Sequence, residues 1–276
     1  MTSSQSVLAA PRTLIAARLA LGWIGRSARK PLHFGLPLMA LAAGIVMEAL
    51  IPRSWRRPAR MELQRALRLA LVGCLPATIV VAVLAGLGMV YQAIYWLRVA
   101  GQEASLGAIL VAILFRQVVP LLVGIILLGR SGSAMLTELG QLHAERQLRA
   151  LQAQGVDPFQ FVVMPRGTAF ALASYTLGIV FILVALLVGF ALASLLGVVQ
   201  TSLWSFLDSV LGATTPADFI VFPLKMIAIG LLIGASACLT ALSAPADEDL
   251  GRMIARGFIR GMLVILLTNG LLSLAI

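Results

Sequence analysis

The chain has 276 residues, of which 60% are hydrophobic and only 12% are charged, and its mean hydropathy is +1.00. A soluble domain carries about 25% charged residues, so this composition excludes an ordinary soluble protein. It predicts an all-α membrane protein whose outer surface faces lipid. The net charge of +10 would suggest nucleic acid in a soluble protein, but the basic residues here lie next to apolar runs. We therefore expect them to set topology and to face anionic lipid headgroups, with no nucleic-acid partner.

The first apolar run, residues 35–51, lies between two basic clusters. The cluster before it contains Arg12, Arg18, Arg26, Arg29 and Lys30, and the cluster after it contains Arg53, Arg56, Arg57, Arg60, Arg65 and Arg68. Both clusters stay in the cytoplasm if the run re-enters the membrane or lies in its interface. We therefore expect residues 1–64 to form a basic region with a membrane-embedded helix, with no secretory signal peptide at its start. A complete crossing by residues 35–51 remains open.

Five further runs are apolar and long enough to span a membrane: roughly 70–97, 106–129, 167–198, 219–241 and 257–276. We expect residues 65–276 to form one membrane domain. The connection 199–218 holds Asp208 and Asp218 and no basic residue, whereas the connections 130–166 and 242–256 are rich in arginine. The positive-inside rule therefore places the two arginine-rich connections and the N-terminus in the cytoplasm.

Small residues recur at four-residue spacing in three of these runs, which allows helix backbones to approach closely in lipid. They are Gly189, Ala193 and Gly197, then Gly230 and Gly234, then Gly257 and Gly261. We expect them to pack helices within the bundle, and a subset could form a dimer contact. Cys74 and Cys238 both lie inside apolar runs, which favours buried thiols over a disulfide.

The sequence lacks the motifs of the common catalytic sites. It has no G-x-x-x-x-G-K-[ST] phosphate loop, and its two histidines, His33 and His143, form no H-E-x-x-H motif. We expect no catalytic residue, no metal site and no cofactor, and therefore no enzymatic activity of the chain alone.

Two cations interrupt the apolar runs. Arg116, followed by Gln117, lies halfway along the run 106–129, where an arginine costs roughly 2.5–3.5 kcal/mol on insertion scales. Pro120 cannot donate to the carbonyl of Arg116, so the helix is expected to kink and leave that carbonyl free. Lys225 follows Pro223 near the outer end of its run, where it could also snorkel. We expect a polar site facing the protein interior, the alternative being an arginine that serves packing alone.

The connection 130–166 is far longer than the usual two to eight residues between packed helices. Leucines at helical spacing predict a short amphipathic helix from Met135 to Gln152, ended by Gly155 and Pro158. A cytoplasmic helix tied to two spans is suited to receive force from a soluble partner.

This connection also carries a family resemblance. The sequence GRSGSAMLTELGQLHAERQLRALQAQGVDPFQFVVMPR resembles the signature of the MlaE permease family, the membrane subunits of ABC transporters that move phospholipid. Upstream, EASLGAILVAILFRQVVP is similar to the same family. The sequence departs from the family pattern at Gln117, which replaces an acidic residue, and at Arg146, Arg149 and Gln152, where acidic residues are usual.

The resemblance implies a homodimer of five-span subunits in the bacterial inner membrane, each with the N-terminal embedded helix. Cytoplasmic ATPase subunits would hydrolyse ATP and dock on the coupling helix of the connection 130–166. A periplasmic MCE-domain lipid-binding protein would sit above the dimer and exchange phospholipid with it. The alternatives are a permease that exports hydrophobic solutes or solvents, and a membrane scaffold for the MCE protein without transport of its own.

The resemblance also implies two groups of functional residues. The substrate group holds the polar residues Arg116, Gln117, Lys225 and Arg252, and Leu84, Met89 and Leu106 along the acyl-chain path. The ATPase-coupling group holds Glu138, Glu145, Arg146, Arg149 and Asp157.

Overall fold

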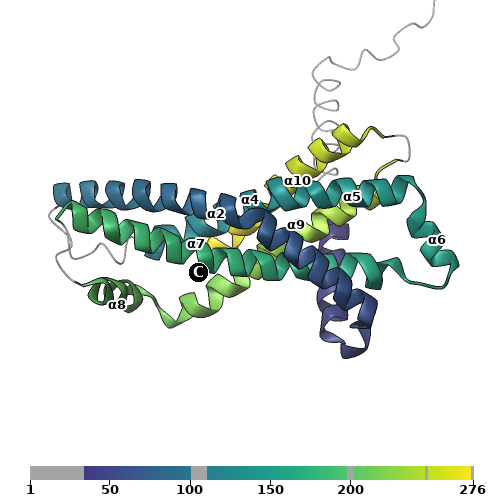
Figure 1. The fold of residues 1–276 in the computed structure, drawn as a ribbon, viewed down its shortest axis with the longest axis horizontal. Coiled ribbons are helices and arrows are strands. Elements are labelled where there is room, and N and C mark those ends of the chain that lie inside the picture. The colour runs from purple at the N-terminus through teal and green to yellow at the C-terminus, as the bar shows by residue number, and fades with distance from the viewer. Residues whose placement is uncertain (1–33, 101–110, 198–201, 246–247, 275–276) are drawn as a thin grey trace, which may run out of the picture.

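The computed structural model describes residues 34–100, 111–197, 202–245 and 248–274, and every regular element in these ranges is helical (Figure 1). Five helices are long and apolar enough to cross a membrane: Arg57–Ala93, Ile113–Ala144, Phe159–Leu195, Pro216–Leu242 and Leu250–Leu274. The predicted all-α membrane architecture with five spans is therefore confirmed.

The elements follow one another in a simple order. After the helix Phe34–Leu50 and the 3-10 turn Pro52–Ser54 come α2 (Arg57–Ala100), a π-helical segment (Val111–Val118), α4 (Val119–Leu127), a second π-helical segment (Leu128–Gly132), α5 (Ser133–Ala144), α6 (Gln147–Ala153), a third π-helical segment (Phe159–Val163), α7 (Met164–Leu195), α8 (Leu203–Ala213), α9 (Pro216–Leu242) and α10 (Leu250–Leu274).

The long helices lie side by side, and α7 is at their centre. It packs along α2 on one side and against α9 on the other, and α10 packs on α9. The short helices mark the two ends of the bundle (Figure 1): α6 lies at one end and α8 at the other. We refer to these as the α6 end and the α8 end.

Close helix approach depends on glycines, as the four-residue spacing predicted. A Cβ on Gly230 of α9 would overlap the carbonyl oxygen of Phe170 in α7 and lie 2.6 Å from Cβ of Ser174. On α2, a Cβ on Gly86 would lie 2.6 Å from the carbonyl oxygen of Ala185. Gly197 differs, because it has φ +69° and lies just beyond the end of α7, with nothing near its Cβ position. The contacts of Gly230 and Gly86 lie within the subunit, and a dimer contact by a subset of the small residues stays a prediction.

The helix α2 bends part-way along its length (Figure 1). Pro76 lies inside it and has no N–H for the carbonyl of Val72, which accounts for the bend. The two halves of α2 therefore run in different directions, and the half before Pro76 crosses α7 at an angle (Figure 1) while Glu62 and Arg65 tie it to α7 and α5.

The second span extends further than predicted. The sequence predicted a boundary at Gly129, but the helix continues through α5 to Ala144. Leu136 and Leu139 of α5 are fully buried, so the polar residues of this stretch occupy only one face of a packed helix. The predicted single helix Met135–Gln152 is instead two helices, because the chain turns at Arg146, whose φ is +57°.

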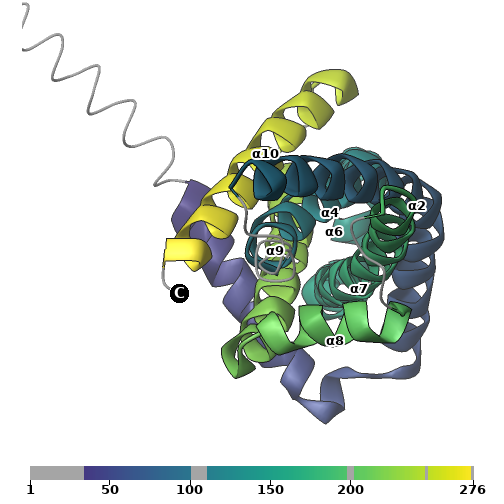
Figure 2. The same ribbon diagram turned by 90° about the vertical axis from the view of Figure 1, so that its left-hand side faces the viewer.

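The helix Phe34–Leu50 lies across the long axis of the bundle in both views (Figure 1 and Figure 2). Leu38, Ala42 and Ile45 form its buried face. Glu48 fixes its end, because its Oε1 accepts hydrogen bonds from Ser54 Oγ at 2.7 Å and from Gln160 Nε2 at 2.6 Å. The helix has 17 residues, fewer than any of the five spans. Whether it lies in the interface stays a prediction.

Candidate functional site

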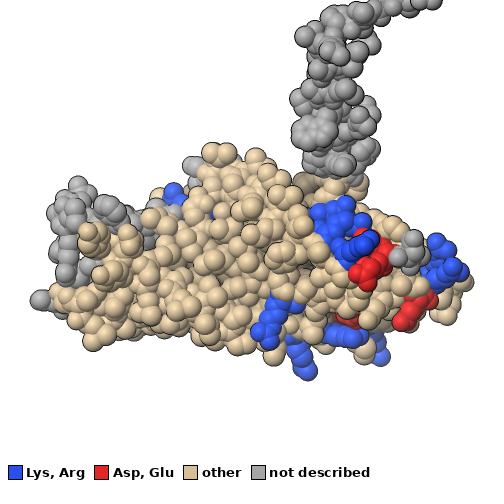
Figure 3. All heavy atoms as spheres, turned by 90° about the horizontal axis from the view of Figure 1, so that it is seen from above, with Lys and Arg blue, Asp and Glu red and all other residues tan. Residues whose placement is uncertain are grey.

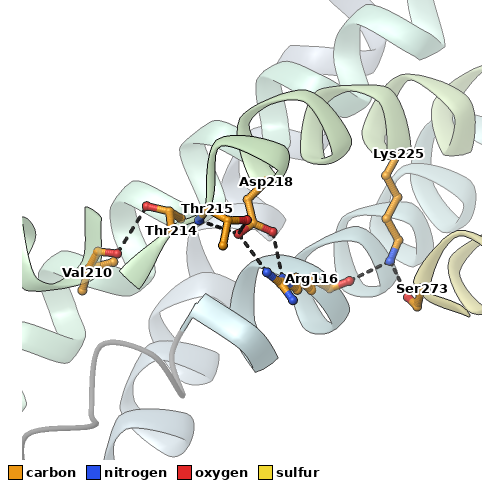
Figure 4. Close-up of polar contacts among 7 residues, drawn as sticks. All are labelled: Arg116, Val210, Thr214, Thr215, Asp218, Lys225 and Ser273. Atoms are coloured by element: carbon orange, nitrogen blue, oxygen red, sulfur yellow. Dashed lines mark hydrogen bonds and ion pairs between the residues drawn. The ribbon is translucent and has the colours of Figure 1, made fainter. Parts of the chain in front are cut away.

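An ion pair between two helices forms the centre of the site (Figure 4). Arg116, in the π-helical segment before α4, donates from Nε to Asp218 Oδ1 at 2.8 Å and from Nη2 to Asp218 Oδ2 at 2.9 Å. This two-point geometry is the strong form of a guanidinium–carboxylate contact. Asp218 is almost buried, with a side chain 7% exposed, whereas the Arg116 side chain is 41% exposed. The arginine therefore keeps an accessible edge.

Asp218 is held in place by the start of its own helix. It lies in the first turn of α9, and its Oδ2 accepts hydrogen bonds from the backbone N–H of Thr215 at 2.9 Å and from Thr215 Oγ1 at 2.8 Å. A carboxylate there also interacts favourably with the positive end of the helix dipole. The carboxylate is thus fixed before it meets Arg116.

Lys225 uses the carbonyl that Pro120 leaves free. Its Nζ donates to the carbonyl oxygen of Arg116 at 2.7 Å and to Ser273 Oγ at 2.7 Å (Figure 4). The sequence predicted the free carbonyl, and the structure supplies its donor. The residue is 3% exposed, so Lys225 points into the protein and does not snorkel.

Gln117 extends the site towards α10. Its Oε1 accepts from Ser273 Oγ at 3.3 Å and from Asn269 Nδ2 at 3.4 Å. The amide thus binds neutral groups at the position where the family pattern has an acid. Asn269 Oδ1 is buried without a hydrogen-bond partner among the described residues.

A cavity of about 240 Å³ is lined by these polar residues other than Thr215 and Asn269. Its charged residues are Arg116, Lys225 and Asp218, and Phe115, Val221 and Phe222 supply apolar wall. Two cations therefore face one carboxylate, which leaves an excess of one positive charge on the lining. An anionic group next to an apolar chain is the ligand that such a lining favours.

The site lies at one end of the bundle. The sequence predicted Arg116 halfway along the second span, but its partners come from the first turn of α9 and the last turn of α10. The error follows from the boundary at Gly129, because the span continues to Ala144. The connection from α8 leads directly into Thr215, so the site is at the α8 end.

Sequence reasoning missed Asp218, Ser273 and Asn269. The predicted spans leave Asp218 in the connection 199–218. The sequence Thr215-Pro216-Ala217-Asp218 carries a signal that would have found it, because a threonine followed three residues later by an acid, with proline in first position, is typical of a helix start. Ser273 and Asn269 carry no comparable local signal.

The other predicted substrate residues do not line this cavity. Arg252 is exposed in the first turn of α10, away from Ser273 near the end of the same helix. Leu84 is exposed on α2, and Met89 is partly buried against the core. Leu106 lies outside the described residues.

The predicted coupling residues separate into two environments. Glu145, Arg146, Arg149 and Asp157 are exposed around α6. Glu138 instead belongs to an ion-pair network, in which its Oε1 accepts from Arg166 Nη2 at 3.0 Å and lies 3.3 Å from Arg65 Nη2. Arg166, only 5% exposed, also donates from Nε to Glu62 Oε1 at 2.7 Å. This network joins α2, α5 and α7.

The surface charge agrees with the predicted orientation. Most of the Lys, Arg, Asp and Glu side chains visible in Figure 3 gather towards the α6 end, and the rest of that face is largely uncharged. The positive-inside rule thus predicts that the α6 end faces the cytoplasm and that the cavity lies at the opposite side of the membrane.

Comparison with known proteins gives consistent relatives. The chain is 27% identical over 174 residues to a Synechocystis protein named as a probable ABC transporter permease, covering 63% of this chain and 65% of that one. It is 28% identical over 206 residues to the chloroplastic protein TRIGALACTOSYLDIACYLGLYCEROL 1 of Arabidopsis thaliana, covering 74% and 57%. It is 32% identical over 108 residues to the intermembrane phospholipid transport system permease protein MlaE of Haemophilus influenzae, covering 39% and 41%. The chain thus spans less than two thirds of the length of each of these relatives.

The sequence model described as Permease MlaE matches residues 63–275, which include most of the first span, the whole of the other four and every residue of the cavity. On this match the chain is a multi-pass membrane protein and a transport permease, and it belongs to the MlaE permease family.

Proposed function

We propose that this permease moves phospholipid between the bacterial inner membrane and a periplasmic MCE-domain protein, as one of two identical subunits. The cavity at the α8 end carries the proposal, because its lining combines an excess positive charge with aromatic and aliphatic wall. A phospholipid offers a phosphate and an apolar chain, which match these two kinds of surface. An uncharged hydrophobic solvent would leave the excess charge unbalanced, so the lining favours phospholipid over solvent export.

Each polar residue has a separate role in this proposal. Arg116 presents its accessible edge to the phosphate while Asp218 holds the guanidinium in one orientation. Lys225 supplies the second positive charge and is fixed by the carbonyl of Arg116 and by Ser273. Binding of an anion would complete the charge balance that the described residues leave open.

The energy for transport would come from separate ATPase subunits. The exposed residues around α6, with Arg146 and Arg149 among them, form the proposed docking surface at the α6 end. The Arg166 network connects α5 to α2 and α7, so a displacement of α5 by the ATPase would move these helices. The helices α9 and α10 would transmit this displacement to the cavity. The two basic residues at positions where acids are usual predict an acidic groove on the ATPase.

The experiment compares Lys225→Met with Asp208→Asn in the complete complex reconstituted in proteoliposomes. Lys225→Met removes one cation of the cavity, whereas Asp208 is exposed on α8 and does not line the cavity. We expect Lys225→Met to lose transfer of a fluorescent phospholipid to the MCE-domain protein, and Asp208→Asn to retain it. Transfer at the wild-type rate by Lys225→Met would contradict the proposal. Transport of a hydrophobic solvent without any phospholipid transfer would favour the exporter, and assembly without either transport would favour the scaffold.

A further inference from the structure

The first half of α2 and the turn before it carry an unusual concentration of positive charge. All six arginines between positions 53 and 68 are exposed: Arg53, Arg56, Arg57, Arg60, Arg65 and Arg68. Among the described residues, only Arg65 has a carboxylate partner, Glu138 at 3.3 Å. The remaining five form what we call the arginine face.

The acids closest in sequence do not balance the arginine face. Glu48 accepts hydrogen bonds from Ser54 and Gln160. Glu62 is paired with the buried Arg166. The positive charge of the arginine face is therefore available to a ligand from outside the described chain.

A groove of about 1080 Å³ runs along the same stretch of α2, on the N-terminal side of the bend at Pro76. Arg65 and Arg68 line it, followed along the helix by the exposed side chains of Leu69 and Val72. Positions 57, 60, 61, 65, 68 and 72 repeat at helical spacing and share one side of α2. Along the helix axis, the lining of the groove therefore changes from positively charged side chains to apolar ones.

The helix Phe34–Leu50 adds a second apolar surface near the same end. Leu36, Met39 and Met47 are exposed on the side opposite its buried face, and the helix lies across the bundle axis (Figure 2). An amphipathic helix in this orientation is typical of the boundary between headgroups and acyl chains. The arginine face, which follows directly in sequence, then lies at headgroup level.

We propose that the arginine face and the α2 groove bind an anionic phospholipid of the surrounding leaflet, with its phosphate at Arg68 and its acyl chains along Leu69 and Val72. This site is at the α6 end, opposite the transport cavity, and does not depend on the proposed transport of phospholipid. A second copy of the chain fits the groove less well. A two-fold contact pairs a patch with itself, so that arginines would face arginines across it.

The test uses the full-length chain with Trp55 as its only tryptophan, after replacement of Trp23, Trp96 and Trp204 by phenylalanine. Trp55 lies between the helix Phe34–Leu50 and α2, and its Nε1 donates to the carbonyl of Ala49 at 2.8 Å. Vesicles of one fixed mixture of phosphatidylglycerol and phosphatidylcholine carry bromine on either the first or the second lipid. We expect brominated phosphatidylglycerol to quench Trp55 more than its share of the bilayer predicts, because the site concentrates the anionic lipid.

Two matched triple variants separate a site from general attraction. The first variant, Arg57→Gln/Arg60→Gln/Arg68→Gln, should lose the preference for phosphatidylglycerol. The second variant, Arg130→Gln/Arg146→Gln/Arg149→Gln, also removes three positive charges, but outside the proposed site, and should retain the preference. All six side chains are exposed, so folding is expected to survive. The corresponding lysine triple at 57, 60 and 68 should retain the preference, because the charge remains.

Three results would overturn the proposal. The first is equal quenching by the two brominated lipids in the parent chain. The second is an equal loss of preference in both glutamine triples, which would reduce the effect to net charge. The third is efficient disulfide formation between subunits carrying Gln64→Cys, because a second copy would then cover the groove that the lipid needs.

Discussion

At the scale of single residues, the site shows how a membrane span accommodates an arginine and a lysine close together. The carboxylate of Asp218 accepts two hydrogen bonds from the guanidinium of Arg116, and the carbonyl oxygen of Arg116 accepts one from the ammonium of Lys225. That carbonyl is available because Pro120, four residues later, has no N–H. One proline therefore creates the acceptor that allows the second cation to be buried.

We predict that Arg116→Met lowers stability and abolishes phospholipid transfer. It leaves the carboxylate of Asp218, with a side chain 7% exposed, without its cation, which costs about 1–3 kcal/mol when a buried group loses its partner. Thermal unfolding of the purified complex and transfer in proteoliposomes measure the two effects separately.

The double variant Arg116→Met/Asp218→Asn is the control for stability. Asparagine is neutral and its amide oxygen still accepts from the N–H of Thr215 at the helix start, so the melting temperature should recover while transfer stays absent. A single variant as stable as the wild type would show that the pair does not hold α9. Restored transfer in the double variant would show that the arginine is needed only for folding.

Local sequence signals predicted the two cations of this site and the free carbonyl, but not the partners of the cations. Arg116 and Lys225 stood out because a cation in an apolar run is expensive, and Pro120 indicated the free carbonyl. The partners could not be assigned, because Asp218 and Ser273 come from α9 and α10, and no local pattern says which helices are neighbours. The pairing of a span with a residue 102 positions away is a property of the tertiary packing.

At the scale of helices, close packing and buried ion pairs hold α2, α5, α7 and α9 together. Arg166 of α7 contacts Glu62 of α2 and Glu138 of α5, so a displacement of α5 is transmitted to two other helices. The boundary of α5 was mispredicted because its polar residues resemble a surface connection. The apolar side of the same helix is confirmed, because Leu136 and Leu139, which the leucine spacing predicted to share one face, are buried.

We predict that Gly230→Ala strongly destabilises the bundle. A Cβ at this position would overlap the backbone of α7 at Phe170 and crowd Ser174 and Ala171, so α7 and α9 would have to separate. Overpacking of this kind typically costs about 1–3 kcal/mol. The melting temperature of the purified protein in detergent measures the loss.

Gly88→Ala provides the matched control on another helix. No atom lies within 4 Å of its Cβ position, and alanine is the better helix former by about 0.8–1.0 kcal/mol. This variant should be neutral or more stable. Melting temperatures equal to that of the wild type in both variants would contradict the prediction, because they would show that the close approach of α7 and α9 does not determine the stability of the bundle.

At the scale of the whole molecule, charge separates the two ends of the bundle. The arginine face, α6 and the Arg166 network lie towards the α6 end, whereas the cavity is at the α8 end. Composition and charge alone predicted this polarity and the number of spans. They did not predict the bend of α2 or the arrangement of the helix Phe34–Leu50, because both depend on what the helices pack against.

We predict that the helix Phe34–Leu50 does not cross the membrane. Cysteines at Gly35 and Arg53, which flank the helix, should both resist an impermeant maleimide added to the outside of spheroplasts, because the positive clusters hold both flanks in the cytoplasm. Both should react after permeabilisation. Cys74 and Cys238 are buried and contribute little background.

A cysteine at Trp204, exposed on α8, is the positive control and should react from the outside. Reaction at only one of the two flanking positions in intact spheroplasts would establish a crossing, and it would move the arginine face to the other leaflet.

The contact between Arg116 and Asp218 also has an evolutionary consequence. The acid that the family pattern has beside the arginine is Gln117 in this chain, and the carboxylate that meets the arginine comes from the head of another helix. An acid at position 117 would add a second carboxylate to a cavity whose charged residues are Arg116, Lys225 and Asp218, and the charges of its lining would then balance. A lineage with an acid at position 117 would keep one carboxylate in the cavity if it lost the one at 218, whereas a lineage with glutamine at 117 would keep none. Among descendants of a common permease, the residues at 117 and 218 should therefore have changed as a pair.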